Sequence, residues 1–151
     1  MITLKNITDC DHRIQELVLE WRNQPRIQAM MINKYIISIH EHADWLYHLR
    51  KKKKHIHYIV FDSGEPFGIA EIKDNDEFGI YIGDDNYLGK GYGLKLMNAF
   101  LEEVFKSRKS IWSLVLRENK GALKLYKNLG FTISETNGEK YYMIELRRRN
   151  K

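Results

Sequence analysis

Cysteine, proline and long apolar runs are scarce in this sequence of 151 residues. Its single cysteine, Cys10, excludes an intramolecular disulfide and any metal site built from several thiolates. No apolar run approaches the roughly 20 residues that a membrane-spanning helix needs, and Met1–Lys5 lacks the apolar core of a signal peptide. We therefore expect a cytoplasmic protein with no membrane segment and no metal ligands.

The composition, with only two prolines and 43% hydrophobic residues, is that of an ordered globular protein. It contains no internal repeat and needs no linker, so we expect one domain over residues 1–151. The net charge of +5 is concentrated in Lys51–Lys54 and in Arg147–Arg149. Such clusters attract polyphosphates or nucleic acid, but a helix C-terminus and a solvated chain end explain them equally well.

Hydrophobic periodicity predicts both strands and helices. Before residue 83 the expected elements are a strand over 2–6, a helix over 11–21, a helical turn over 26–31, a helix that starts from a capping box of Ser38 and Glu41, and antiparallel strands over 55–61, 67–73 and 77–82. Later elements are a helix over 94–105, a strand over 111–116 buried in the centre of the sheet, a helix capped by Asn119, and a hairpin around Asn137 and Gly138. This order predicts the α/β (α+β) class, with a mixed, mainly antiparallel central sheet of about seven strands flanked by about four helices.

Three glycines at alternate positions separate a predicted strand from a predicted helix. They lie in the segment Leu88-Gly89-Lys90-Gly91-Tyr92-Gly93. Glycine permits positive φ and close approach of a ligand, while the helix that follows points free N–H groups and its positive dipole end into the loop. The pattern indicates a pyrophosphate site. Glycine is also common in ordinary turns, so its meaning depends on the rest of the chain.

A second motif runs from Asn119 to Phe131 and contains Ala122, Leu125-Tyr126 and Gly130. Together with the glycine segment it resembles the GNAT superfamily of acetyl-coenzyme A dependent N-acetyltransferases, and the predicted order of strands and helices fits as well. The resemblance implies that acetyl-CoA is the co-substrate. It also implies that the coenzyme's pyrophosphate lies on the backbone amides of Gly89, Lys90, Gly91, Tyr92 and Gly93.

One position departs from the family pattern. The superfamily usually has Arg or Gln where this chain has Leu88, and that side chain adds to pyrophosphate binding. Leucine has no hydrogen-bond donor, so the backbone amides and the helix dipole carry the binding. We expect Leu88 to pack into the core instead.

Tyr126 matches the superfamily's usual general acid. A phenol with an unperturbed pKa of about 10 stays protonated at neutral pH and can protonate the thiolate that leaves during acetyl transfer. An isolated tyrosine would more simply be a buried core residue. Asn119 is expected to cap its helix, and the resemblance adds a polar contact to the coenzyme's pantetheine arm.

The acceptor amine must lose a proton before it attacks. Glu77 is the predicted base, with Glu71 and Tyr81 as alternatives, although each could be a solvent-facing strand residue. The resemblance further implies that a backbone amide between Ile80 and Ile82, a segment that includes Tyr81, polarises the thioester carbonyl. The sequence does not select among these three amides.

The N-terminal helices should recognise the acceptor. The segment Trp21–Ile27, with Met30-Met31, His40–His42 and Trp45, resembles the branch of the superfamily that N-acetylates a UDP-linked 4-amino sugar in bacterial pseudaminic acid biosynthesis. In that interpretation Arg22 and Arg26 bind a diphosphate, while Met30, His42 and Trp45 offer apolar or stacking surface. Taken singly, these residues also suit a helix core or a surface cation.

Other functions remain open at this point. The acceptor could be a protein N-terminus, a ribosomal protein or a charged tRNA, and a non-catalytic coenzyme-binding regulator would also need the glycine loop. We do not expect a nucleic-acid-binding module, because no helix-turn-helix or aromatic-rich RNA motif is evident. Antiparallel edge strands would allow a homodimer.

Overall fold

The computed structural model describes residues 1–31 and 35–149. The elements, in chain order, are β1 Ile2–Asn6, a 3-10 turn η1 Ile7–Asp9, α1 His12–Arg22, α2 Pro25–Met30, α3 Ile39–Leu49, β2 Ile56–Asp62, β3 Glu65–Ile72, β4 Phe78–Ile82, a 3-10 turn η2 Asp85–Tyr87, α4 Tyr92–Val104, β5 Ser110–Leu116, α5 Lys120–Asn128, β6 Thr132–Glu135 and β7 Tyr141–Arg147. No helix in these ranges is long and apolar enough to cross a bilayer.

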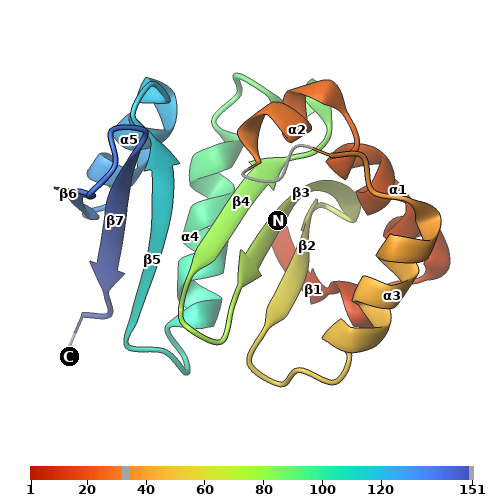
Figure 1. The fold of residues 1–151 in the computed structure, drawn as a ribbon. Coiled ribbons are helices and arrows are strands. Elements are labelled where there is room, and N and C mark those ends of the chain that lie inside the picture. The colour runs from red at the N-terminus through yellow and green to blue at the C-terminus, as the bar shows by residue number, and fades with distance from the viewer. Residues whose placement is uncertain (32–34, 150–151) are drawn as a thin grey trace.

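The seven strands form two antiparallel sheets, in the orders β1-β2-β3-β4 and β5-β7-β6. Among the described residues, one isolated parallel bridge, between Glu77 and Trp112, joins them, and β4 and β5 diverge from that point toward their C-terminal ends (Figure 1). The predicted class is confirmed, although the sheet is divided. The helices α1, α2, α3, α4 and α5 number five, because the expected turn over 26–31 is a short helix.

The first sheet is covered on both faces. The side chains of Leu96, Met97 and Phe100 from α4 are fully buried against one face, and α1 and α3 bury Val18 and Leu46 against the other. Apolar residues at intervals of three and four place these side chains on one stripe of each helix. This covering fixes the position of β4 relative to α1 and α4.

The expectation that the strand over 111–116 is buried in the centre of the sheet is only half correct. In β5, Ile111, Ser113 and Val115 are buried, while Trp112 and Leu114 are partly exposed. Successive strand residues point to opposite faces. In Figure 1, α1 and α3 lie beside the first sheet, on the side away from β5, and no helix lies over the face of β5 that is turned to the viewer.

The predicted helix starts are confirmed. Ser38 and Glu41 form a complete capping box at α3, Asp11 caps α1, and Asn119 accepts a hydrogen bond from the N–H of Ala122 at α5. Each cap contributes on the order of 1 kcal/mol to stability. Local side-chain chemistry therefore fixes where these three helices begin.

The hairpin of β2 and β3 contains a β-bulge between Val60 and Phe61, where the pairing shifts by one residue. Beyond the bulge His57 pairs with Glu71, and Glu71 in turn pairs with Gly79 of β4. Residues directly opposite on neighbouring strands lie on the same face of a sheet. The bulge therefore places an imidazole and a carboxylate side by side.

Candidate active site

The glycine loop, residues 88–93, leads from η2 into α4. Gly89 and Gly91 have φ values of +71° and +80°, which glycine adopts without strain, and a Cβ on either would meet no atom within 4 Å. Among the described residues no backbone acceptor takes the N–H of Gly89, Lys90 or Gly91, and α4 starts at Tyr92 with its own free amides. The loop and the helix dipole can therefore bind a pyrophosphate.

An aromatic cluster packs where the glycine loop enters α4. The hydroxyl of Tyr92 donates to Asp62 Oδ2 at 2.7 Å, and its ring lies edge-on to those of Tyr87 and Phe67, with centroids 4.7 and 5.1 Å away. The hydrogen bond from Tyr92 is the main cause that lowers the pKa of Asp62 below its usual value. Sequence reasoning missed Asp62 and Phe67, because their approach to the loop depends on the β2–β3 hairpin.

The prediction for Leu88 is wrong. This residue was expected to pack into the core, but its side chain is 40% exposed at the start of the glycine loop. The short turn η2 ends at Tyr87 and the chain is extended at Leu88, so this side chain points outward.

This exposure makes Leu88→Arg a test of the loop. A new guanidinium beside the pyrophosphate should lower the coenzyme dissociation constant about tenfold, as expected for roughly 1.4 kcal/mol from a charged hydrogen bond. Isothermal titration calorimetry with coenzyme A measures this dissociation constant. Ile133→Arg adds the same charge on exposed β6 as a control. Equal affinities of the two variants would contradict the placement of the phosphate.

Within the described part of the chain, the outer edge of β4 pairs with no other strand. On its inner side, the carbonyl of Glu77 accepts from the N–H of Lys73, and the N–H of Gly83 donates to the carbonyl of Phe67. Because hydrogen bonding alternates along an antiparallel pair, the amide of Tyr81 faces β3, whereas those of Ile80 and Ile82 face the diverging β5. Within the predicted segment, Ile80 and Ile82 are thus placed to polarise a carbonyl between the sheets.

Tyr126 lies in the core beside this edge. Its side chain is 6% exposed, and its ring centroid is 5.7 Å from that of Phe78 and 5.1 Å from that of Phe131. Burial raises the pKa of Tyr126 above its usual value. The phenol therefore keeps its proton at neutral pH, which is the form that a general acid requires.

The two predicted arginines differ in their surroundings. Arg26 Nη2 donates to the carbonyl of Ile82 at 2.9 Å, and its Nε donates to Asp85 at 3.1 Å. These contacts attach α2 to the end of β4, so most of the donors expected to bind a diphosphate already have protein partners. Arg22 is the last residue of α1 and lies near Tyr81. Burial raises the pKa of Tyr81, and the charge of Arg22 offsets part of this increase.

The other predicted acceptor residues are spread over two helices. His42 and Trp45 of α3 lie together, with ring centroids 5.5 Å apart, and His42 Nε2 is 3.0 Å from the carbonyl of Gln15. Burial lowers the pKa of His42. Met30 at the end of α2 is 43% exposed. The structure thus brings His42 and Trp45 together and leaves Met30 on the surface.

Glu77 lies where the two sheets meet. Its backbone forms the bridge to Trp112, and its carboxylate forms an ion pair with Lys73 at 3.6 Å. This is the closed end of the divergence between β4 and β5. The role of Glu77 as a base stays a prediction.

A carboxylate with two imidazoles lies on the face of the sheet below α3. Glu71 Oε2 is 3.2 Å from His55 Nε2 and 3.5 Å from His57 Nδ1, and the edge of the Trp45 ring packs on His57 at 4.8 Å. His57 is 9% exposed, and both its ring nitrogens are buried without a well-formed hydrogen bond. Sequence reasoning missed the two histidines, because the bulge that sets His57 opposite Glu71 leaves no clear sequence signal.

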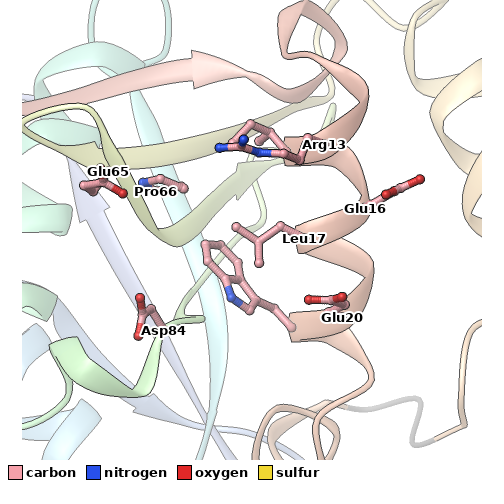
Figure 2. Close-up of a pocket in the computed structure, with 9 residues that line it drawn as sticks. Arg13, Glu16, Leu17, Glu20, Glu65, Pro66 and Asp84 are labelled. Atoms are coloured by element: carbon pink, nitrogen blue, oxygen red, sulfur yellow. The ribbon is translucent and has the colours of Figure 1, made fainter.

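A pocket of about 330 Å³ lies elsewhere, between α1 and the turn of β2 and β3. Arg13 and Leu17 of α1 face Glu65, Pro66 and Asp84 across it (Figure 2). Its remaining lining residues are Ile14, Glu16, Glu20 and Trp21. This acidic pocket shares no residue with the glycine loop or with Tyr126, and a polyphosphate would meet mostly carboxylates there.

Comparison with known proteins agrees with this geometry. Residues 13–131 match the acetyltransferase (GNAT) family. Acetyltransferase PseH of Campylobacter jejuni is 32% identical over 149 residues, which cover 95% of this chain and 92% of that protein. The crystal structure of Campylobacter jejuni N-acetyltransferase PseH in complex with acetyl coenzyme A superposes with a TM-score of 0.77 at 27% identity, covering 99% of this chain and 100% of that one.

A more distant structure supports the fold alone. Aminoglycoside acetyltransferase AAC(6')-Ib in complex with coenzyme A has a TM-score of 0.78 at 19% identity, with 98% of this chain and 95% of that chain covered. The family match spans most of the chain, including the glycine loop and Tyr126. The chain is therefore an acetyl-CoA-dependent N-acetyltransferase that belongs to the acetyltransferase (GNAT) family.

Proposed function

We propose that the chain transfers the acetyl group of acetyl-CoA to the 4-amino group of a UDP-linked amino-deoxy sugar. The amine attacks the thioester directly, and Tyr126 protonates the departing thiolate. One observation carries this mechanism: Tyr126 packs against Phe78 at the outer edge of β4 and retains its proton through burial. The coenzyme's thioester would lie along that same edge.

The coenzyme is held mainly by backbone groups. The amides of Gly89, Lys90 and Gly91, with the start of α4 at Tyr92 and Gly93, receive the pyrophosphate. The N–H groups of Ile80 and Ile82 face the thioester carbonyl and stabilise the oxyanion that forms on it. Asn119 caps α5 through its side-chain oxygen, which leaves its amide NH₂ for the pantetheine arm.

The acceptor class rests on the N-terminal helices. The residues from Trp21 to Trp45 that resemble the UDP-amino-sugar branch lie in the part of the chain that is also similar to PseH. Trp45 and His42 supply a stacking surface, and Arg22 supplies a cation at the end of α1. Arg26 contributes by holding α2 in place.

A panel of amine acceptors tests the proposal. Release of coenzyme A thiol is measured with a UDP-linked 4-amino sugar, with kanamycin, and with a peptide that has a free N-terminus. We expect kcat/KM for the UDP-sugar to exceed the other two values by at least about 10²-fold, because its diphosphate and base add binding energy absent from the others.

The same panel identifies the alternatives. Preference for the peptide would assign the chain to protein N-terminal acetylation. Binding of coenzyme A without turnover of any amine would indicate a regulator. Either result contradicts the proposed acceptor.

A further inference from the structure

Glu71 presents its two carboxylate oxygens to different surroundings. Both imidazole contacts go to Oε2, from His55 at 3.2 Å and His57 at 3.5 Å. Oε1 instead lies beside Gly79 of β4, where a Cβ would be 3.8 Å away. The Glu71 side chain is 28% exposed. One oxygen is thus engaged by imidazoles, and the other remains accessible across a residue that has no side chain.

This carboxylate and the phenol of Tyr126 lie on opposite sides of the same strand. Phe78 and Gly79 are consecutive in β4, so they point to opposite faces. Phe78 packs against Tyr126, while Gly79 lies next to Glu71. Consider a thioester bound at this edge, with the amine approaching from the face of Gly79. The amine would then lie near Glu71, and the leaving sulfur would lie near Tyr126 on the opposite face.

We propose that Glu71, with His55 and His57, is the proton-accepting group of the acetyl transfer. The inference rests on the proposed function, since it needs an ammonium as acceptor. The ammonium gives one proton to Glu71 Oε1, and this proton then leaves to solvent, which restores the carboxylate. The amine nitrogen then bonds to the thioester carbon, the C–S bond breaks, and the sulfur takes the proton of Tyr126. A second proton, lost from the nitrogen, restores the phenol.

The charges around the cluster are consistent with this route. Burial opposes ionisation of Glu71, but the hydrogen bond with His55 and the close imidazole of His57 outweigh it and hold the pKa of the carboxyl below its usual value, with help from the charge of Lys73. Glu71 is therefore an anion that attracts an ammonium. The other titratable groups nearby are Tyr81 on β4, Arg22 on α1 and His42 on α3.

The pH dependence of Glu71→Gln tests the inference. At pH 7 we expect kcat/KM for the UDP-linked 4-amino sugar to fall about 10²-fold. As pH rises and the amine loses its proton in solution, the difference in kcat/KM between the variant and the intact enzyme should shrink tenfold per pH unit, because a neutral amine needs no base. The kcat/KM of the intact enzyme should reach its plateau at a lower pH than that of the variant. A purely structural defect would not produce recovery at high pH.

Gly79→Ala provides an independent variant that keeps the carboxylate. Its methyl group would stand at an ordinary contact distance from Oε1, and Gly79 has no positive φ, so folding should be retained. Covering Oε1 should lower kcat/KM about tenfold while leaving the dissociation constant of coenzyme A unchanged. Thermal unfolding of both variants checks that the fold is intact.

The outcomes separate the two proposals. If the intact enzyme acetylates none of the three acceptors in the panel, the proposed function fails and this inference fails with it. If the intact enzyme is active and Glu71→Gln keeps its activity and pH profile, the inference alone is overturned. If Glu77→Gln shows the loss and the recovery at high pH that we expect of Glu71→Gln, the base is Glu77.

Discussion

Replacing Tyr126 with Phe is expected to lower kcat at neutral pH by at least about 10²-fold, the usual contribution of a positioned general acid. The thiolate must then leave without a proton donor. Phenylalanine retains the ring, so the packing with Phe78 and Phe131 is preserved and the midpoint of thermal unfolding should change little. Coenzyme affinity should also be unchanged, because the pyrophosphate site lies in the glycine loop.

Single-turnover kinetics should accompany the steady-state assay, so that product release does not mask the chemical step. Tyr141→Phe is a suitable control, since this tyrosine lies on β7 and loses the same hydroxyl. If Tyr126→Phe retains its full single-turnover rate, Tyr126 is not the acid.

The pH dependence of stability follows from the same burial. The pKa of Tyr126 is raised in the folded state, so the contribution of the neutral phenol is fully present below the unfolded pKa of about 10 and is lost as pH rises through the folded value. Stability should therefore decline in the alkaline range, and Tyr126→Phe should lessen the decline. The rest of the decline comes from other tyrosines whose pKa is raised, such as Tyr81 and Tyr58, where burial is the main cause.

Gly83→Ala should be the most destabilising small substitution that we consider. The indole of Trp21 lies directly over Gly83, so a Cβ there would stand 2.1 Å from Cδ2 and 2.3 Å from Cε3. Trp21 is only 4% exposed, and its ring would have to leave its packed position toward the pocket that it lines to relieve this contact. Overpacking of this kind costs about 3 kcal/mol, which lowers the unfolding midpoint by roughly 6–12 °C.

Gly121→Ala is the matched control, because a Cβ on this residue of α5 meets nothing within 4 Å and alanine favours helix. Combining Gly83→Ala with Trp21→Leu should cost less than the sum of the two single changes, since the smaller side chain removes the clash. An unfolding midpoint for Gly83→Ala equal to that of Gly121→Ala would contradict the close approach.

Features that depend on neighbouring residues were predictable from the sequence. The capping box of Ser38 and Glu41, the cap at Asn119 and the left-handed glycines of the loop each rely on chemistry within a few residues. The order of strands and helices follows from periodicity in the same way. These signals led to the predicted pyrophosphate site, because the backbone groups of the glycine loop lie in one short segment.

Features that depend on distant residues were not predictable. Without the bulge between Val60 and Phe61, the hairpin would pair His57 with Ala70 rather than Glu71. A shift of one residue changes which side chains share a face, and the sequence gives no clear sign of it. Arg26 likewise looked free to bind substrate, because its partners Ile82 and Asp85 are more than fifty residues away.

The single bridge between Glu77 and Trp112 has a consequence for motion. Among the described residues, the facing edges of β4 and β5 beyond this bridge form no strand pair, so their amides can open locally while the core shared by the two sheets stays packed. An acyl-pantetheine arm inserted between β4 and β5 would bond to these edges and restrict that opening. Amide hydrogen exchange at Ile80 and Ile82 should then slow when coenzyme binds, while exchange within β2 stays the same.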